Sequence, residues 1–264
     1  MASVLPEKQI KSANRVLEIL ELFDASRQTV TVMDVARALG VPQSSTSELL
    51  GCLVKQGYLQ RDRYARTYAP TARVALLGAW VQPNLFRNGR LLPMMDEIVE
   101  DSGHPVFLAS MVGVVLRHVH VVGCEVAHAM RSGSDHSLLH SPLGKVLLST
   151  FDREVVRKLV HRLNAEAEPE QFVRINDLLA DLDQIRAKGY ATGLAEDQCS
   201  AIVSVLLPQS GEEQMSLGIA VPLEAMEENL ARYVKLLRGA VSSHLGPTLA
   251  SSTYTERPRY ARVM

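Results

Sequence analysis

A run of polar side chains in the first quarter of the chain carries the clearest chemical signal. It consists of Gln43, Ser44, Ser45, Thr46 and Ser47, directly before an apolar stretch. Amide and hydroxyl groups at the start of a helix can bond to base edges and phosphates when that helix enters the major groove of DNA. Hydroxyl groups at the same place can instead only cap the helix, by accepting hydrogen bonds from its first amides. The neighbouring elements decide which role is favoured.

Three arginines suited to phosphate contact follow this run. Arg61, Arg63 and Arg66 lie between two short segments, near residues 58–59 and 67–69, whose composition favours β-strands. Arginines at the tip of such a hairpin can lie on phosphates or reach into a minor groove. A charged hairpin that is merely solvated is the plainer alternative.

The elements that would position both groups are two short helices around a tight turn. Apolar residues recur at helical spacing in each helix. They are Val32, Val35, Ala36 and Leu39 in the first, and Leu49, Leu50, Leu53 and Val54 in the second. Gly40 can adopt the left-handed conformation that ends a helix, and Pro42 suits the start of the next. Two such helices followed by a hairpin predict a winged helix-turn-helix, whose second helix reads the major groove.

Length and charge are compatible with a small DNA-binding part on a larger body. A chain of 264 residues favours two domains over one. Its net charge of −1 does not mark a nucleic-acid-binding protein as a whole. Residues 1–75 nevertheless contain 10 Lys or Arg against 7 Asp or Glu, so the head is mildly basic and the body acidic.

Cysteine spacing and hydropathy exclude several other classes of protein. Cys52, Cys124 and Cys199 have neither metal-ligand spacing nor the pattern of a disulfide framework. We expect Cys52 to be a small core residue of the second helix. Without a signal peptide or an apolar run of membrane-spanning length, the chain is predicted to be cytoplasmic, with no membrane partner. We find no motif for an enzyme and expect no cofactor.

The rest of the chain indicates a second, larger domain of the α+β class. An amphipathic helix over residues 9–26 opens the chain, packed through Val16, Leu17, Ile19 and Leu20. The predicted domains are a DNA-binding domain over 1–70, a linker helix and dimer contact over 71–88, an α+β domain over 89–246 and a disordered tail over 247–264. The linker is too apolar to lie bare in water, which predicts a dimer. An antiparallel sheet partly covered by loops is a natural pocket for a small molecule.

Six of the eight histidines fall within residues 104–140. They are His104, His118, His120, His128, His136 and His140. Since histidine is a common metal ligand, one alternative is a metal- or redox-responsive regulator that uses this segment with Cys124 or Cys199. The plainer interpretation is a set of partly exposed histidines without a function.

Two segments of the second domain resemble the IclR family of bacterial transcriptional regulators. SPLGKVLLSTF, residues 141–151, is similar to the family's motif around a Gly-Lys pair. LLADLDQIRAKGYA, residues 178–191, is similar to its R-x-x-G-Y-A helix, and an acidic turn at Glu196 and Asp197 follows. The resemblance implies a GAF-like effector-binding domain, binding to double-stranded operator DNA, a homodimer or tetramer, and control of a catabolic or transport operon. It also implies an effector among small organic, sugar or aromatic acids.

The resemblance also assigns the effector pocket, where this chain departs from the family's pattern. The corresponding positions are Pro142, Leu143, Gly144, Leu194, Ser204, Gly218 and Ala220, with His128 and His136 as replacements for missing polar anchors. Pro142 has no amide hydrogen to donate, and most of the other anchors are small or apolar. Because buried polar groups of a ligand would then be unpaired, we expect an effector that is bulkier and less polar than a two- or three-carbon acid, such as an aromatic one. Glycine and alanine at 218 and 220 are expected to make room for it.

Overall fold

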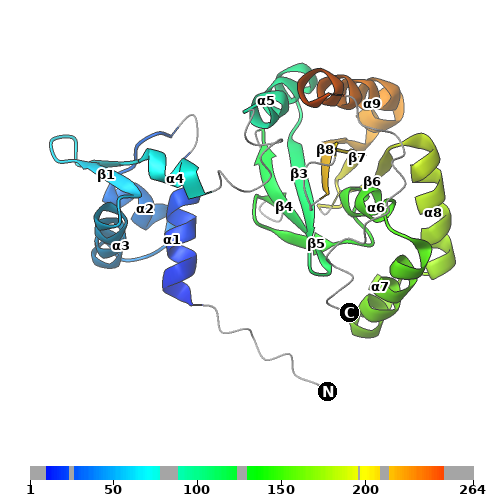
Figure 1. Cartoon of the computed structure of the whole chain (residues 1–264), viewed down its shortest axis with the longest axis horizontal. Coiled ribbons are helices and arrows are strands. Elements are labelled where there is room, and N and C mark those ends of the chain that lie inside the picture. Colours follow the sequence, from blue (N-terminus) through cyan, green and yellow to red (C-terminus); the bar gives the residue numbers. More distant parts are fainter. Residues whose placement is uncertain are drawn as a thin grey trace. The chain divides into compact units, whose positions relative to one another are not determined.

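The computed structural model describes residues 10–23, 27–77, 89–123, 130–195, 197–208 and 214–246. They belong to two compact units, Met1–Val81 and Gln82–Met264. Each unit has its own helices and its own sheet (Figure 1). Residues 78–88 of the predicted linker and the predicted tail lie outside the described residues. Among the residues that the structure describes, no helix is long and apolar enough to span a bilayer.

The N-terminal unit is a helical cluster with a hairpin. Its elements are α1 (Lys11–Glu21), α2 (Val32–Leu39), α3 (Gln43–Lys55), β1 (Leu59–Asp62), β2 (Thr67–Pro70) and α4 (Ala72–Leu77). The core contains Ile19, Val35, Leu50, Leu53 and Tyr68, so α1, α2, α3 and the hairpin each contribute an apolar face to it. The predicted helix-turn-helix and hairpin are confirmed, because the apolar stripes of α2 and α3 face this core.

Local side-chain chemistry determines where α2 begins and ends. The Asp34 carboxylate accepts a hydrogen bond from the Thr31 amide at 2.9 Å, and the Thr31 hydroxyl accepts one from the Asp34 amide at 3.2 Å. This reciprocal pair satisfies two amides that a helix start otherwise leaves unpaired. At the other end, Gly40 has a φ of 62° and closes the helix in the left-handed conformation, as predicted.

Two expectations for this unit were wrong. Leu17 does not pack on the helix pair but is 59% exposed, because α1 turns only the face around Ile19 to the core. Cys52 is exposed, since it lies between the buried positions Leu50 and Leu53 and points away from them.

The second unit is built on one antiparallel sheet with the strand order β5-β4-β3-β8-β7-β6. The strands are β3 (Val106–Val112), β4 (Val115–Val122), β5 (Asp135–Ser137), β6 (Ala191–Leu194), β7 (Ser200–Leu206) and β8 (Met215–Pro222). Gly113, with a φ of 62°, forms the predicted tight turn between β3 and β4.

Helices cover both faces of this sheet, which confirms the α+β class. Helices α5 (Leu91–Ser102) and α9 (Leu223–Leu245) lie on one face. On the other face lie α6 (Pro142–Leu148), α7 (Arg153–Glu166), α8 (Ile175–Lys188) and the short 3₁₀ helix η2 (Pro169–Gln171). Alternate strand residues serve the two layers: Phe107 packs toward α6, and Leu108 packs toward α5 and α9.

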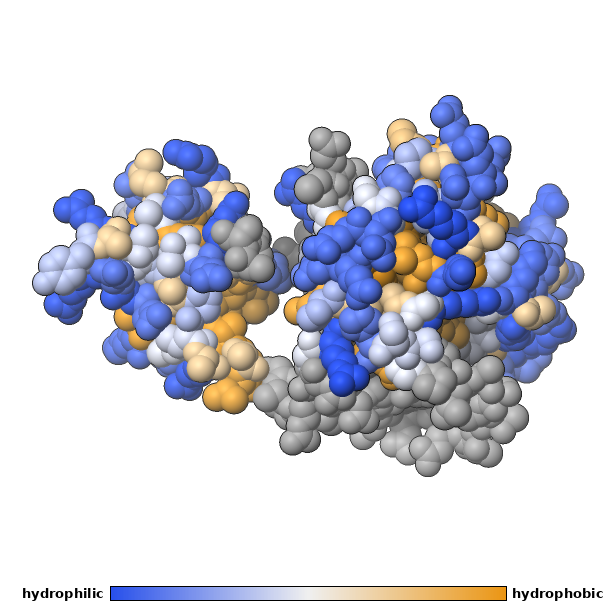
Figure 2. Space-filling model, turned by 90° about the horizontal axis from the view of Figure 1, so that it is seen from above, coloured by the Kyte–Doolittle hydropathy of each residue, from blue (hydrophilic) through white to orange (hydrophobic). Residues whose placement is uncertain are grey.

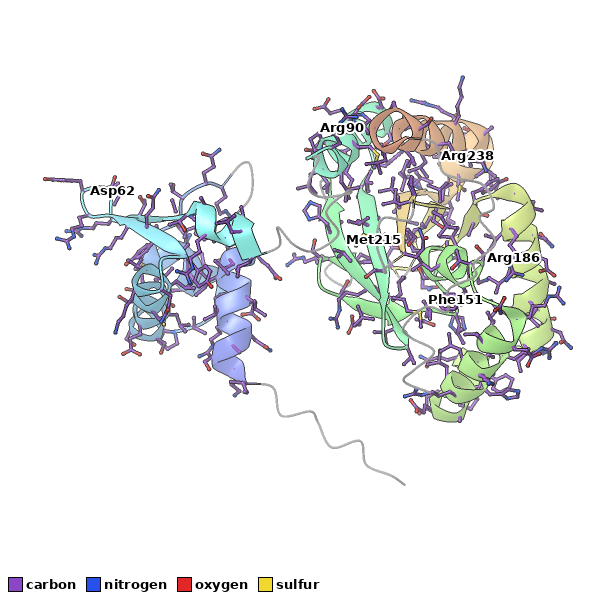
Figure 3. All side chains as sticks on the ribbon, in the orientation of Figure 1. Asp62, Arg90, Phe151, Arg186, Met215 and Arg238 are labelled. Carbon is purple, nitrogen blue, oxygen red and sulfur yellow. The ribbon has the colours of Figure 1, made fainter. Side chains whose placement is uncertain are left out.

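The R-x-x-G-Y-A segment connects α8 to the end of α6. Arg186 donates hydrogen bonds to the carbonyl oxygens of Ser149 and Phe151, both at 2.7 Å, and pairs with Asp183 at 2.9 Å. Figure 3 labels Arg186 and Phe151 at this junction. Three residues on, Gly189 ends α8 with a φ of 72°. The family's motif therefore has a structural role in this chain.

The glycine of the Gly-Lys pair allows α6 to approach the preceding loop. A Cβ atom at Gly144 would lie 2.2 Å from the Leu138 carbonyl oxygen and 2.9 Å from its carbon. Both neighbours are backbone atoms, which cannot move aside without shifting the chain. Any other residue at this position would force α6 away from residues 138–141.

We therefore expect Gly144→Ala to lower the free energy of unfolding of this unit by about 3 kcal/mol, through overpacking. Gly239→Ala is the matched control, because a Cβ atom there has nothing within 4 Å. Since it replaces an exposed helical glycine, it should be neutral or stabilise by up to about 1 kcal/mol. Urea unfolding followed by circular dichroism measures both, and equal midpoints would contradict this account of the motif.

Candidate functional site

The start of α3 presents most of the predicted DNA-contacting side chains to solvent. Gln43, Ser44 and Ser47 are exposed, and Ser45 is half-buried. Gln43 also donates a hydrogen bond to the sulfur of Met33 at 2.6 Å, which ties the start of α3 to α2. These residues form a polar surface on the first two turns of the helix.

Thr46 does not belong to this surface, and its prediction as a DNA contact was wrong. Its side chain is 0% exposed, and its hydroxyl donates to the Pro42 carbonyl oxygen at 3.0 Å. The reason is helical spacing, since residues 46, 50 and 53 share the face that packs into the core. For this one residue, the plainer role of stabilising the helix start fits the geometry.

The β1–β2 hairpin carries the three arginines: Arg61 lies in β1, and Arg63 and Arg66 lie in the turn. The Asp62 carboxylate accepts hydrogen bonds from the amides of Tyr64 and Ala65, at 2.8 and 3.0 Å (Asp62 is labelled in Figure 3). Arg66 completes the turn in the left-handed region with a φ of 56°. Arg61, Arg63 and Arg66 are all exposed. The hairpin therefore presents positive charge on a turn whose backbone the Asp62 side chain holds in place.

The hairpin is also fastened to the segment before α2. The Val30 amide donates to the Tyr68 carbonyl oxygen at 3.0 Å, and the Tyr68 amide donates to the Val30 carbonyl oxygen at 2.8 Å. Tyr68 is buried in the core of the unit. The polar surface on α3 and the arginine-bearing hairpin thus belong to a single packed body.

The second unit contains a large open cavity beside the start of α6. It has a volume of about 870 Å³ and is bordered by β5, the loop over residues 138–141, the end of α7, η2 and β6. Its lining combines apolar and polar side chains. The lining residues used below are His136, His140, Ser141, Lys145, Glu166, Glu170 and Leu194.

Only two of the predicted effector-binding residues, His136 and Leu194, line this cavity. Leu143, Ser204, Gly218 and Ala220 are instead buried between α6 and the sheet, beside Pro142 and Gly144. The Ser204 hydroxyl donates to the Pro142 carbonyl oxygen at 2.9 Å, so that hydroxyl is already engaged. The prediction that these six residues line the pocket does not match the cavity of the structure. His128 lies outside the described residues.

The expected extra room at position 218 is already filled. A Cβ atom on Gly218 would lie 3.0 Å from Leu143 Cδ2 and 3.1 Å from both Ile202 Cγ2 and the Val203 carbonyl oxygen. Ala220 is buried in the same cluster. The small residues on β8 therefore accommodate Leu143 rather than a ligand, and the expectation that they make room was wrong.

The histidines that the structure describes do not assemble a metal site. Within the described ranges, no group of three or more His, Cys, Asp or Glu side chains could hold a metal ion. His118 and His136 instead stack, with ring centroids 4.1 Å apart, and His136 Nε2 lies 2.7 Å from the Ser134 hydroxyl. The metal- or redox-responsive alternative therefore finds no support.

Asp197 of the predicted acidic turn has a structural role. Its carboxylate accepts hydrogen bonds from the amides of Cys199 and Ser200, both at 2.9 Å, and from the Ser200 hydroxyl at 2.7 Å. These contacts shape the connection between β6 and β7. Glu196 lies outside the described residues.

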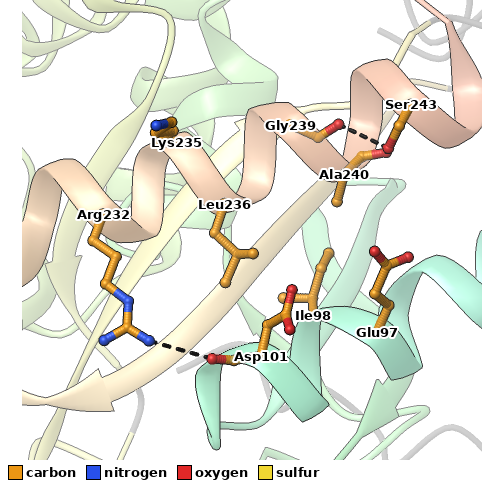
Figure 4. Close-up of a pocket in the computed structure, with 9 residues that line it drawn as sticks. All are labelled: Glu97, Ile98, Asp101, Arg232, Lys235, Leu236, Gly239, Ala240 and Ser243. Atoms are coloured by element: carbon orange, nitrogen blue, oxygen red, sulfur yellow. Dashed lines mark hydrogen bonds between the residues drawn. The ribbon is translucent and has the colours of Figure 1, made fainter.

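A second groove lies between α5 and α9, on the other helical layer (Figure 4). Its volume is about 470 Å³, and its floor includes Ile98, Leu236 and Ala240. Arg232 crosses one end and donates to the Asp101 carbonyl oxygen at 3.4 Å. This groove contains none of the residues that the sequence predicted, so the cavity beside α6 is the better candidate for an effector site.

Three histidines of the second unit make its stability depend on pH. The pKa values of His104, His120 and His140 are lowered, in each case chiefly because burial disfavours the charged ring. Arg232 adds to the effect at His104, as does Lys145 at His140. The unfolded chain therefore takes up protons near pH 6.5 that the folded chain does not bind.

Stability should accordingly fall as the pH is lowered from 7.5 to 5.5. His120→Gln should flatten this dependence, because it removes a group that charges only on unfolding. His161→Gln, which changes an exposed histidine on α7, is the control. Urea midpoints across the pH range provide the measurement, and a rise in stability toward pH 5.5 would refute the prediction.

Family comparisons match both units of the chain. The model of the IclR helix-turn-helix domain matches residues 12–63, and that of the bacterial transcriptional regulator IclR C-terminal domain matches residues 88–244. The transcriptional repressor IclR of Escherichia coli K12 is 27% identical over 192 residues, 69% of each chain. The regulator KdgR of the same organism is 24% identical over 260 residues, 93% of this chain and 98% of the relative.

Solved structures share the fold over nearly the whole chain. The IclR protein of Thermotoga maritima aligns with a TM-score of 0.56 at 19% identity, covering 90% of this chain and 100% of that one. An IclR homolog from Microbacterium hydrocarbonoxydans, complexed with 4-hydroxybenzoate, aligns with a TM-score of 0.56 at 18% identity, covering 89% and 98%. The chain, with a winged helix-turn-helix unit and an effector-binding α+β unit, belongs to the IclR family of DNA-binding transcriptional regulators.

Proposed function

We propose that this family member controls a catabolic operon, as a repressor or dual regulator, under the control of a small molecule bound in its second unit. The observation that carries the proposal is the match of both family domains to a chain whose α3 and hairpin expose DNA-compatible side chains. Relatives support the operon assignment: they include an acetate operon repressor of Salmonella typhimurium and a glycerol operon regulatory protein of Streptomyces coelicolor.

The proposed DNA contacts come from α3 and from the hairpin. The exposed side chains of Gln43, Ser44 and Ser47 and the half-buried Ser45 would meet base edges and phosphates in the major groove. The arginines at 61, 63 and 66 would bind phosphates on either side, which fixes orientation rather than sequence. The effector would act by binding the DNA-competent and the DNA-incompetent arrangements with unequal affinity.

A homodimer is the proposed minimal assembly. Leu17 on α1 is 59% exposed, and Leu76 and Leu77 on α4 are 67% and 50% exposed. Figure 2 shows hydrophobic residues reaching the surface of this unit. Single exposed leucines are common on protein surfaces, but three on two short helices favour an interaction surface. A second copy of the chain would cover them. Dimers also allow a helix-turn-helix protein to read two half-sites.

The proposed effector is larger and less polar than glyoxylate or pyruvate, and it binds in the cavity beside α6. A volume of about 870 Å³ suits an aromatic or similarly sized molecule. Apolar side chains such as Val115, Leu138 and Leu163 contribute to its lining. The relative that was solved with 4-hydroxybenzoate supports a ring-sized ligand for this fold.

We expect Arg63→Ala to weaken binding to DNA uniformly across sequences and to reduce the salt slope by about one unit, as the loss of one phosphate contact requires. Ser45→Ala should weaken binding to the preferred sequence more than to random DNA. Fluorescence anisotropy measures both, on a duplex selected from a random pool with the full-length chain. Arg162→Ala, on α7 of the other unit, is the control. Unchanged binding by both test variants would refute the proposed recognition surface.

If this dimer forms, substitutions at its contact should lower the mass of the protein in solution. Leu76→Glu and Leu17→Glu should shift the protein toward monomer, because each places a charge at the proposed contact. Leu92→Glu, at another exposed leucine but on α5, should leave the assembly intact. Sedimentation velocity at several concentrations distinguishes the species. A wild-type chain that is monomeric throughout would exclude this interface.

A further inference from the structure

At the inner wall of the second unit, two of the positions that the family resemblance assigns to the effector cannot donate a hydrogen bond to a carboxylate. Pro142 has no amide hydrogen, and the hydroxyl of Ser204 is bonded to the Pro142 carbonyl oxygen. Leu143 occupies the space beside Gly218, so a ligand cannot reach the strands behind it. Binding must therefore use the outer cavity. An acid requires positive charge there, but the unpaired charges of this cavity are negative.

Lys145 is the one cationic side chain that lines this cavity within the described ranges, and it is already paired. Its ammonium lies 3.0 Å from the Asp181 carboxylate. The lining also contains three carboxylates, from Asp135, Glu166 and Glu170. Arg117 binds both oxygens of Asp135, at 2.6 and 2.7 Å. Glu166 and Glu170 have no ion-pair partner within the described ranges, so the cavity border has an uncompensated negative charge.

Two further polar groups of the lining are the His140 ring and the Ser141 hydroxyl. Burial, aided by Lys145, lowers the pKa of His140 and so favours its uncharged ring. Ser141 is 4% exposed, and its hydroxyl is buried without a hydrogen-bond partner in the described part of the chain. A hydroxyl can accept or donate a hydrogen bond, so Ser141 indicates a polar ligand atom without deciding its charge.

We infer that the effector of this chain binds as a neutral or positively charged molecule with a ring-sized apolar body, and not as a carboxylate. This rests on the proposed effector site beside α6. A carboxylate entering the cavity would lose hydration without gaining an unpaired cation, and it would face Glu166 and Glu170. An alcohol or amine would donate to these carboxylates or to neutral groups such as His140. The inference thus replaces the acid that the family resemblance implies.

Three probes that share one ring and differ in a single group test the charge preference directly. They are 4-hydroxybenzoate, 4-hydroxybenzyl alcohol and 4-hydroxybenzylamine, titrated into the full-length protein by calorimetry at pH 7.5. We expect the alcohol to bind about tenfold more tightly than the acid, because the acid loses hydration uncompensated. The amine should bind about threefold more tightly than the alcohol, as partly exposed charge pairs allow. Tightest binding by the acid would overturn the inference, as would no binding by any of the three at millimolar concentration.

A pair of substitutions tests the source of the preference. The double variant Glu166→Gln and Glu170→Gln should abolish the advantage of the amine over the alcohol and leave the affinity for the alcohol unchanged. Glu168→Gln is the matched control, because it is exposed in the same segment but does not line the cavity. If the control variant loses the amine preference as fully as the double variant does, Glu166 and Glu170 are not its source and the inference fails.

DNA binding in the absence of any probe separates this inference from the proposed function. If the wild-type chain binds its selected duplex and Arg63→Ala weakens that binding, the regulator assignment stands whatever the probes do. Tight binding of glyoxylate would refute both the proposed size of the effector and its inferred charge. A chain that binds no DNA would instead refute the proposed function and leave the ranking of the three probes to decide the inference.

Discussion

The contact of α6 with the backbone of Leu138 governs the organisation of the effector unit. Only a glycine at 144 allows this approach, and it brings Leu143 against Gly218 on the central strand β8. Helix α6 thereby separates a filled interior from an outer cavity that Ser141 and Lys145 border. The proposed size and charge of the ligand, and the stability of the unit, therefore depend on where this helix lies. The Gly-Lys motif is therefore a packing device that also determines which space a ligand can enter.

Two different physical devices hold the functional surfaces of the two units. In the N-terminal unit, hydrogen bonds within short segments shape the surface: Thr31 with Asp34, and Asp62 with the hairpin amides. In the second unit, contacts distant in sequence do so, such as Arg186 with the carbonyl oxygens after α6. This division suits a protein in which one part recognises DNA and the other senses a molecule.

The difference between local and distant contacts also explains what could be predicted from the sequence. Helix periodicity, the Gly40 turn and the hairpin depend on neighbouring residues, and they were predicted. Helical spacing could also have predicted the burial of Thr46, since it lies four residues before Leu50. The run of hydroxyl residues around it favoured the wrong interpretation. The packing of Leu143 into the space beside Gly218 could not be predicted from local pattern, because the two residues are 75 positions apart. The family resemblance assigned the pocket residues one position at a time. It could therefore not show that the Leu143 side chain occupies the space left by the absence of a side chain at Gly218.

The bridge between Val30 and Tyr68 has a consequence for how operators can vary. It joins the arginine hairpin to the strand-like residue just before α2, so the hairpin cannot swing independently of α3. For the proposed contacts, the distance between the bases that α3 would read and the phosphates that the hairpin would bind is then constant. Under this proposal, a base substitution in the operator weakens single contacts, whereas an insertion between the two contacted stretches removes one set of contacts completely. Under this proposal, operators recognised by this protein can differ in base sequence but not in the spacing between the two sets of contacts.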